Sequence, residues 1–434
     1  MQYESSSSSA NSNSRPHEIV ITGLGVASPI GIGRDAFWRA MLERRSGVRI
    51  LTSFDSRSLP VRFGGEIIDF DPKQYVIPRK SLKVMSRDIQ LGYTVAKLAT
   101  ADANLEAGSV DPERLSVVFG TEMMYSDLQE LSDAFRTCVV NGRFDFSRWG
   151  EYAMGEMFPL WLLKYLPNMS ACHIGIAHDA RGPNNSITLG EVSSLLALTE
   201  GMRLIERGQT DVVVTGGASS RLHPTLLVWQ GDRHLSHRAE DPAAASRPFD
   251  MGRDGMVNGE GAAAFVLESR QHAEARGANI LASILGYACI FEPRANGCPI
   301  RGVAISSAIE HVLRTAHLEP KEIGHVNAHG DSTIDNDRAE ASAIHRVLGE
   351  VPVTAPKSFF GNLGAATGAV EMAASLIALK EGKVPVTLNY DQPDPACPIN
   401  VIHQKPLSNC KPTALLLNQA PMGQSVAVVI SGPD

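Results

Sequence analysis

The stretch 182–218 shows the clearest pattern of apolar and polar positions in the chain. Residues 185–189 are partly β-branched and follow a Gly-Pro-Asn turn, which predicts a short strand. Residues 192–207 carry apolar side chains on a wide helical stripe and end before a glycine, which predicts a largely buried helix. Residues 211–216 are apolar and predict a buried strand. Glu191 then lies at the N-terminus of the helix, where free N–H groups and the helix dipole favour a carboxylate.

Strand and helix patterns alternate along the rest of the chain, and this alternation predicts an α/β fold. The sequence contains no run of 18 apolar residues, so we expect no membrane span. Further strands are predicted at 19–23, 115–120, 262–268, 280–286 and 325–328, and further helices at 35–45, 78–105, 303–316 and 339–348.

Composition narrows the possible functions. The net charge is −7 and there is no basic run, which argues against a nucleic-acid partner. The six cysteines form no Cys-x-x-Cys pair, so we expect reduced thiols in a cytoplasmic protein. The histidines lack metal-ligand spacing, and Ser28 replaces the third glycine that a dinucleotide-binding turn would need after Gly23 and Gly25. We therefore expect no metal and no cofactor. Residues 1–16 are rich in serine and asparagine, which predicts a disordered tail and not a signal peptide.

The segment 182–218 also resembles the active-site segment of the β-ketoacyl-acyl carrier protein synthases, the condensing enzymes of the thiolase superfamily. In that family a Gly-Pro-Asn or Gly-Pro-Ser turn leads by a fixed count to the catalytic cysteine, and counting without gaps from Gly182 places Glu191 at that position. The TGLGVASPIG, SRPFD and RDG-x-V-x-GEGA elements match the same family. The resemblance covers residues 17–432.

The resemblance implies the thiolase-like fold, an α/β fold with a five-layered α-β-α-β-α sandwich made of two duplicated halves. We place the N-terminal half at 17–268 and the C-terminal half at 269–434, after the tail. The second half carries the other groups that resemble catalytic residues. VNAHGDSTIDNDRAE contains His329 at the first catalytic histidine position, although a histidine at such a place can also be a hydrogen-bonded core residue.

KSFFGNLGAATGAVE resembles the segment that carries the family's second histidine. Lys357 and Glu371 are kept there, but the second histidine is Asn362. The family's Cys-His-His set thus becomes Glu191, His329 and Asn362. A condensing enzyme needs a thiolate to hold the acyl chain as a thioester, and a carboxylate would form only a labile anhydride. We therefore expect no condensation by this chain alone.

Two further departures concern the substrate arm. Asp331 replaces a threonine that reaches the phosphopantetheine arm in the family, while Thr333 is kept. A carboxylate near an anionic phosphate would weaken binding of that arm. The C-terminal segment 418–431 stands where the family has a G-F-G-G-T-N gating loop, with Gly423 retained and Ala420 and Met422 at the two phenylalanine positions.

Two surfaces suggest protein partners. Arg79, Lys80 and Lys83 are typical of a solvated helix face, but they align with the family's basic patch that docks an acidic acyl carrier protein. Residues 123–166 are rich in methionine and aromatic side chains. This region could be ordinary loop and helix core, but in the family it builds the dimer interface and lines the acyl tunnel, so we expect a homodimer or a heterodimer with an active synthase.

Three functions remain open. The first is a silent β-ketoacyl synthase-like protein of fatty acid or polyketide-type biosynthesis, acting like a chain-length factor as the partner of an active synthase. The second is a malonyl-thioester decarboxylase or an otherwise altered acyltransferase. The third is a non-catalytic protein that binds acyl chains or acyl carrier protein. For the site itself, we expect Glu191 to contact His329 directly or through one water, as a charge-assisted pair.

Overall fold

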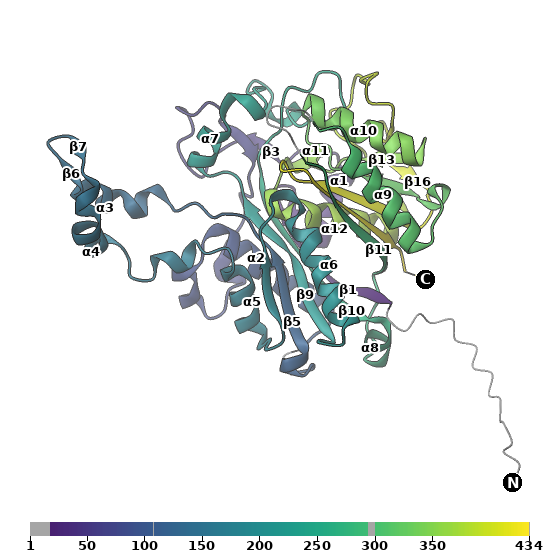
Figure 1. The fold of residues 1–434 in the computed structure, drawn as a ribbon, viewed down its shortest axis with the longest axis horizontal. Helices are drawn as coiled ribbons and strands as arrows, with labels where there is room; N and C mark the ends of the chain where they lie inside the picture. The colour runs from purple at the N-terminus through teal and green to yellow at the C-terminus, as the bar shows by residue number, and fades with distance from the viewer. Residues whose placement is uncertain (1–17, 107, 294–299, 434) are drawn as a thin grey trace, which may run out of the picture.

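The computed structural model describes residues 18–106, 108–293 and 300–433, and the predicted disordered tail at 1–16 lies outside them. A large mixed sheet runs through the body and helices cover it (Figure 1). The sheet consists of two parts that meet where β1 pairs with β11, with Ile19 opposite Ile284. The two parts belong to the N-terminal and C-terminal portions of the chain.

The N-terminal part of the sheet has the strand order β8-β5-β9-β10-β1. β9 and β5 are parallel, as are β5 and β8, whereas β10 is antiparallel to both β9 and β1. The apolar runs predicted from the sequence form the buried strands of this part. Their bounds are β1 (Ile19–Ser28), β5 (Leu115–Gly120), β8 (Asn184–Ile187), β9 (Val212–Ser220) and β10 (Glu260–Ser269).

The C-terminal part repeats this order and these directions. Its order is β13-β12-β17-β18-β11, with β15 added beside β13. Here β12 is parallel to β13 and β17, and β18 is antiparallel to β17 and β11. The duplication that the resemblance implied is therefore present in the strand topology, while the boundary at 268–269 stays a prediction. The bounds are β11 (Ala282–Phe291), β12 (His325–Asn327), β13 (Pro352–Thr354), β15 (Asn400–Val401), β17 (Thr413–Gln419) and β18 (Gln424–Ser431).

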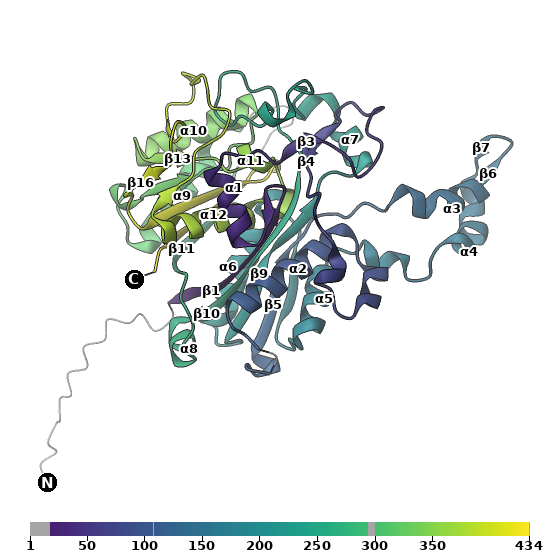
Figure 2. The same ribbon diagram turned by 180° about the vertical axis from the view of Figure 1, so that it is seen from behind.

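Helices complete five layers. α2 (Arg87–Asp102) and α5 (Met169–His178) cover the outer face of the N-terminal part, and α9 (Val303–Ala316) with α10 (Ile334–Leu348) covers that of the C-terminal part (Figures 1 and 2). α6 (Ser193–Glu206) and α12 (Thr367–Glu381) form the middle layer, because α6 packs on β9 and α12 packs on both β10 and β17. The fold is thiolase-like.

The remaining elements are short. The helices are α1 (Arg34–Leu42), α3 (Ser132–Thr137), α4 (Met154–Glu156), α7 (Pro224–His234), α8 (Arg270–Ala275) and α11 (Lys357–Phe360). The strands are β2 (Gly31–Ile32), β3 (Val48–Ile50), β4 (Phe63–Gly65), β6 (Val139–Val140), β7 (Arg143–Phe144), β14 (Lys383–Val384) and β16 (Leu407–Ser408). None of the helices in the described ranges combines the length and the apolarity that crossing a membrane requires.

One predicted helix is interrupted. The segment predicted as a helix over 78–105 forms a 3-10 helix at Arg79–Val84 and then α2, with an extended Met85 between them. Ser86 caps α2 by accepting a hydrogen bond from the Ile89 amide, and a serine at this position favours a new helix start.

Residues 123–166 form an arm that projects from the body and carries α3, β6, β7 and α4 at its far end (Figures 1 and 2). Phe135, Phe144 and Trp149 pack against one another there. Many of its large apolar side chains are exposed, with Phe146 at 75% and Met154 at 63%. The alternative of ordinary core therefore holds only for the parts of this region that pack into small clusters, such as Met124 and Ala134, and many of its other large apolar side chains are exposed.

Candidate active site

Glu191 lies directly before the middle-layer helix α6. It belongs to a 3-10 turn, Gly190–Val192, in which Gly190 has a positive φ of 62°. The Ser193 hydroxyl holds this turn closed, since it donates to the Gly190 carbonyl at 2.6 Å and accepts from the Leu189 amide at 2.8 Å. The Glu191 side chain is buried and 3% exposed. The structure therefore puts a carboxylate at the N-terminal end of a buried helix, as the sequence pattern predicted.

Arg221 forms an ion pair with this carboxylate. Its Nη1 lies 2.7 Å from Glu191 Oε1, and its Nη2 and Nε lie 2.6 Å and 3.1 Å from the two carboxylate oxygens of Glu122. Arg221 follows β9 and Glu122 follows β5, and these strands are parallel neighbours, so their carboxyl ends meet at one edge of the sheet. The guanidinium thus bridges two carboxylates. Burial opposes the charge on Glu122, but Arg221 lowers the pKa of Glu122 below its usual value.

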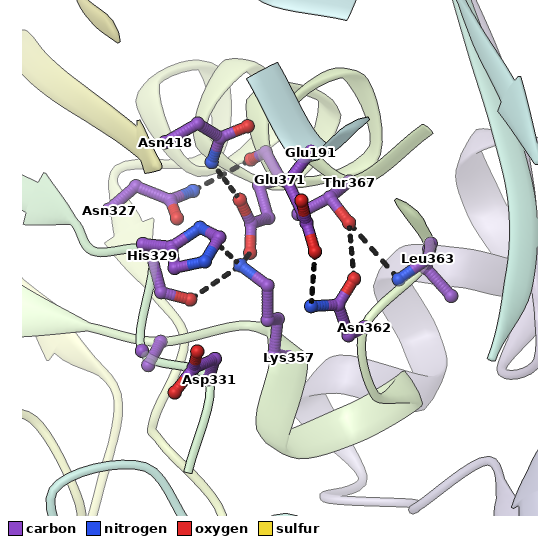
Figure 3. A network of polar contacts seen from close by, with 12 residues as sticks. Glu191, Asn327, His329, Asp331, Lys357, Asn362, Leu363, Thr367, Glu371 and Asn418 are labelled. Atoms are coloured by element: carbon purple, nitrogen blue, oxygen red, sulfur yellow. Dashed lines mark hydrogen bonds and ion pairs between the residues drawn. The ribbon is translucent and has the colours of Figure 1, made fainter. Parts of the chain in front are cut away.

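Asn362 joins Glu191, Arg221 and Glu122 in a first cluster of polar side chains. Its Oδ1 accepts from Arg221 Nη1 at 3.2 Å and from the Gly364 amide at 2.9 Å, and its Nδ2 lies 3.4 Å from Glu191 Oε1 (Figure 3). The second oxygen of Glu191, Oε2, is buried and has no hydrogen-bond partner among the described residues. The structure therefore brings Glu191 and Asn362 together, and Arg221 joins them.

His329 belongs to a second cluster with Lys357, Glu371 and Asn418 (Figure 3). Lys357 Nζ lies 3.2 Å from His329 Nδ1 and 2.6 Å from Glu371 Oε1, and the second oxygen of Glu371 accepts from Asn418 at 2.7 Å. Burial and the nearby charge of Lys357 lower the pKa of His329 well below its usual value. Burial also raises the pKa of Glu371 to about 7, although Lys357 opposes this rise.

The hydrogen bonds of His329 define its tautomer. Nδ1 faces Lys357 Nζ and the Gln419 amide at 3.4 Å, both of which are donors, so Nδ1 accepts and the ring proton lies on Nε2. Glu340 fixes the backbone at this point, because it accepts from the amides of His329 and Gly330 at 2.7 Å and 2.8 Å. A neutral histidine with a protonated Nε2 can donate a hydrogen bond to a carbonyl oxygen.

Our expectation of a direct charge-assisted contact between Glu191 and His329 is wrong. Within the described residues, the polar partners of Glu191 are Arg221 and Asn362. Burial and the charge of Lys357 lower the pKa of His329, which disfavours the imidazolium form that such a contact needs. A guanidinium offers a stronger, permanently charged partner than this imidazole.

Asp331 and Thr333 are joined by hydrogen bonds. The Thr333 hydroxyl donates to Asp331 Oδ1 at 2.6 Å, the Thr333 amide donates to the same oxygen at 2.9 Å, and Asn336 donates to Oδ2 at 2.9 Å. Burial opposes the charge on Asp331, but these hydrogen bonds help to lower its pKa. The hydroxyl proton of Thr333 is thus already used inside the chain.

The other predicted site residues lie at the surface or in a turn. Ala420, Met422 and Gly423 form the turn between β17 and β18; Ala420 is buried, Met422 is exposed, and Gly423 has a φ of 106° beside the Glu292 carbonyl. Arg79, Lys80 and Lys83 are exposed on the 3-10 helix Arg79–Val84.

Sequence reasoning missed Arg221 and Glu122. The available signal was their position, since an arginine and a glutamate each follow a largely buried strand. Once β5 and β9 are known to be parallel neighbours, two such charges at one sheet edge are natural partners, but the sequence does not give that pairing.

Comparison with known proteins explains the fold. The sequence matches the family "Beta-ketoacyl synthase, N-terminal domain" over residues 17–273 and "Beta-ketoacyl synthase, C-terminal domain" over residues 281–391. This chain belongs to the β-ketoacyl synthase family. The 3-oxoacyl-[acyl-carrier-protein] synthase 2 of Synechocystis sp. is 32% identical to it over 396 residues, which make up 90% of this chain and 92% of that protein.

Other relatives of this β-ketoacyl synthase family member come from polyketide pathways. The tetracenomycin polyketide synthase ketoacyl synthase alpha subunit of Streptomyces glaucescens is 33% identical over 432 residues, covering 96% of this chain and 97% of that protein. Among solved structures, a β-ketoacyl synthase from Burkholderia phymatum superposes with a TM-score of 0.86 at 28% identity, covering 96% of this chain and all of that one. A type II polyketide acyl-carrier protein in complex with its ketosynthase gives a TM-score of 0.78 at 27% identity and covers 97% and 100% of the two chains.

The arrangement limits the chemistry open to this β-ketoacyl synthase-like chain. Glu191 has one oxygen engaged by Arg221, so its nucleophilicity is reduced further by the ion pair. His329 and Asn362 both carry N–H groups that can polarise a carbonyl, but the Asn362 amide cannot take up or release a proton at ordinary pH. The site can hold an ion network and polarise a carbonyl group, and it offers no thiol at position 191.

Proposed function

We propose that this chain is a silent subunit of fatty acid or polyketide-type biosynthesis, which acts like a chain-length factor as the partner of an active β-ketoacyl synthase. The observation that carries the proposal is the Glu191–Arg221 ion pair at the N-terminus of α6, the position that the resemblance assigns to the nucleophilic cysteine. A carboxylate held by a guanidinium cannot store an acyl chain as a stable thioester.

The substrate-arm region supports the same proposal. Asp331 is buried, its hydrogen bonds help to lower its pKa, and it engages the hydroxyl of Thr333. A phosphopantetheine phosphate near this carboxylate would meet a repulsive charge. The chain is therefore poorly suited to receive a carrier-bound substrate in its own site.

The arm at residues 123–166 is the feature that supports binding of a second protein chain. Its exposed aromatic and methionine side chains together form more apolar surface than a soluble monomer ordinarily exposes to water. We therefore propose that a second thiolase-like chain covers them. That chain would be an active synthase or, in the alternative, a second copy. Arg79, Lys80 and Lys83 are exposed and free to meet an acidic acyl carrier protein delivered to such an assembly.

Decarboxylation of a malonyl thioester is the second candidate. The donor Nε2 of His329 favours it, because a thioester carbonyl polarised there would stabilise the enolate that forms as CO2 leaves. Glu191 and Asp331 act against it, because both carboxylates would repel the malonyl carboxylate. A purely binding role for acyl chains or carrier protein is the third candidate.

One experiment separates these functions. The purified chain is incubated with malonyl acyl carrier protein, and intact mass and CO2 release are measured, first alone and then with each cysteine-containing synthase of the same genome. We expect no loading and no CO2 from the chain alone, and a stable complex with altered product length with one synthase. Release of CO2 by the chain alone would favour the decarboxylase. Carrier or acyl binding without any synthase partner would favour the binding protein.

A further inference from the structure

Arg221 is held from several sides. Its amide donates to the Gly259 carbonyl at 3.1 Å, and its own carbonyl accepts from Asn258 Nδ2 at 3.2 Å. Its guanidinium is bonded to Glu122 through two nitrogens and to Glu191 and Asn362 through the third. The side chain is only 6% exposed. The guanidinium therefore has a fixed place beside the side chain of residue 191.

Gly364 packs tightly against one side of this guanidinium. A Cβ added to Gly364 would lie 2.0 Å from Glu122 Oε2 and 2.6 Å from Arg221 Nε. The backbone of the turn before α12 thus packs directly on the ion pair, and even one methyl group would not fit. A cavity of about 760 Å³ does exist nearby, but it is lined by Asp88, Ser220 and other residues and does not include Glu191.

We infer that Arg221, held in place by Glu122, closes position 191 to acyl chains. Oε1 of Glu191 faces Arg221 and Asn362, so a group that extends from residue 191 in this direction would occupy the place where they now lie. An alkyl chain there would press against a desolvated guanidinium, which is unfavourable for both groups. The two hydrogen bonds between Arg221 and Glu122 do not involve Glu191, so Arg221 still blocks the site when Glu191 is replaced.

The biological meaning of this inference rests on the proposed function, because that function places residue 191 where a synthase carries its acyl chain. The closure itself concerns only packing around residue 191. Arg221 is therefore a specificity-determining residue, and Glu122 is a positioning residue that acts through it. Both can be tested without any partner synthase.

The test measures how the size of an electrophile affects the labelling of a cysteine at position 191. Glu191→Cys protein is treated with iodoacetamide and, in parallel, with N-dodecyl iodoacetamide, and labelling of the peptide that carries residue 191 is followed by mass spectrometry. We expect rapid reaction with the small reagent, because Arg221 favours the thiolate, and slow reaction with the long one. Wild-type protein reports the background from the native cysteines.

Opening the site should change the ratio of the two rates. In Glu191→Cys with Glu122→Ala and Arg221→Ala, we expect the ratio of long-chain to short-chain labelling to rise by at least about tenfold. Glu191→Cys with Arg87→Ala is the matched control, because Arg87 also pairs with a buried carboxylate, Glu260, but does not touch residue 191. That control should keep the ratio of the Glu191→Cys protein.

A second variant covers the chance that the triple change does not fold, which circular dichroism reports. Glu191→Cys with Glu122→Gln retains Arg221 but weakens the hydrogen bonds that orient it. The ratio of long-chain to short-chain labelling should therefore rise by a smaller factor. Equal labelling by both reagents in the Glu191→Cys protein would overturn the inference. An unchanged ratio in the folded opened variants would overturn it as well, whatever the partner experiments show.

Discussion

Arg221 Nη1 lies 2.7 Å from Glu191 Oε1, and this contact joins two nearly buried side chains that lie on different elements, one after β9 and one before α6. The pair has a third member, Glu122, on the far side of the guanidinium. Two carboxylates and one guanidinium therefore share one buried region, and the positive charge of Arg221 offsets the negative charges of Glu191 and Glu122.

Arg221→Ala should destabilise the protein by about 3 to 5 kcal/mol, because it leaves buried carboxylates without a counter-charge. Urea unfolding at neutral pH measures the change in free energy. Arg57→Ala is the comparison, since Arg57 pairs with Asp55 on the surface and is 87% exposed. Its effect should stay within about 0.5 kcal/mol, and an equal effect of both changes would show that the buried pair has no special role.

The purified protein should form no acyl thioester on itself when it is incubated with an acyl or malonyl carrier protein. The reason is the carboxylate at position 191, which cannot hold a stable acyl group. Intact mass before and after treatment with hydroxylamine or a thiol measures the loading. Stable loading that a thiol reverses, on any cysteine of the chain, would contradict this prediction.

Glu191→Cys should not restore condensation by itself. Asn362 cannot titrate as a histidine does, and Arg221 remains beside the new thiol. We expect more activity, if any is gained, from Glu191→Cys combined with Asn362→His, measured as product formed from acyl and malonyl carrier protein. If the single change were as active as the double, Asn362 would not be a barrier.

Asp88 should make the protein less stable as the pH rises from about 4 to about 6. Its carboxylate accepts from the Ser220 amide at 2.7 Å, and burial together with the charges of Glu260 and Glu122 raises its pKa to about 6. The unfolded chain releases this proton near its usual pKa of 3.8, so between the two values the folded state binds more protons. Stability from this group is full below the lower value and is lost as the pH rises through the higher one.

Asp88→Asn should remove this pH-dependent loss of stability. Between pH 4 and pH 6 its free energy of unfolding should therefore rise relative to that of wild type by at most about 3 kcal/mol. Urea unfolding at several pH values measures it. Asp211→Asn is a control of opposite sign, because hydrogen bonds from Arg114 lower the pKa of Asp211 and its stabilising effect is lost as the pH falls. A constant difference between wild type and Asp88→Asn across this range would contradict the assignment.

Changes on the arm should affect assembly and not folding. Phe146 and Phe158 are exposed on the arm, so Phe146→Asp with Phe158→Asp should weaken the dimer or the complex with a synthase. Sedimentation at micromolar concentration and thermal unfolding measure the two properties. Val303→Ser, at an exposed position on the outer helix α9, should leave assembly unchanged. A protein that is monomeric before any change, with and without a synthase, would remove the basis of this prediction.

The sequence allowed the local elements to be predicted better than the contacts between them. β5 and α9 match their predicted bounds, because apolar periodicity and flanking turns are local signals. The duplicated thiolase-like fold came only through the resemblance, and the order of the strands was not predicted, since pairing between distant strands leaves no local mark. The pair of Arg221 and Glu122 was missed for the same reason: the two residues lie 99 residues apart, and the parallel pairing of β5 and β9 brings them together.

The buried network also constrains how this chain can change over generations. Loss of Arg221 first would leave two carboxylates uncompensated, and loss of Glu122 first would remove the fork that orients the guanidinium. Replacement of Glu191 leaves Arg221 paired with Glu122, and replacement of Glu122 leaves it paired with Glu191 alone. Among the three single changes, replacement of Arg221 is therefore the one that leaves two buried carboxylates without a counter-charge, so it is the least accessible first step toward a thiol at position 191.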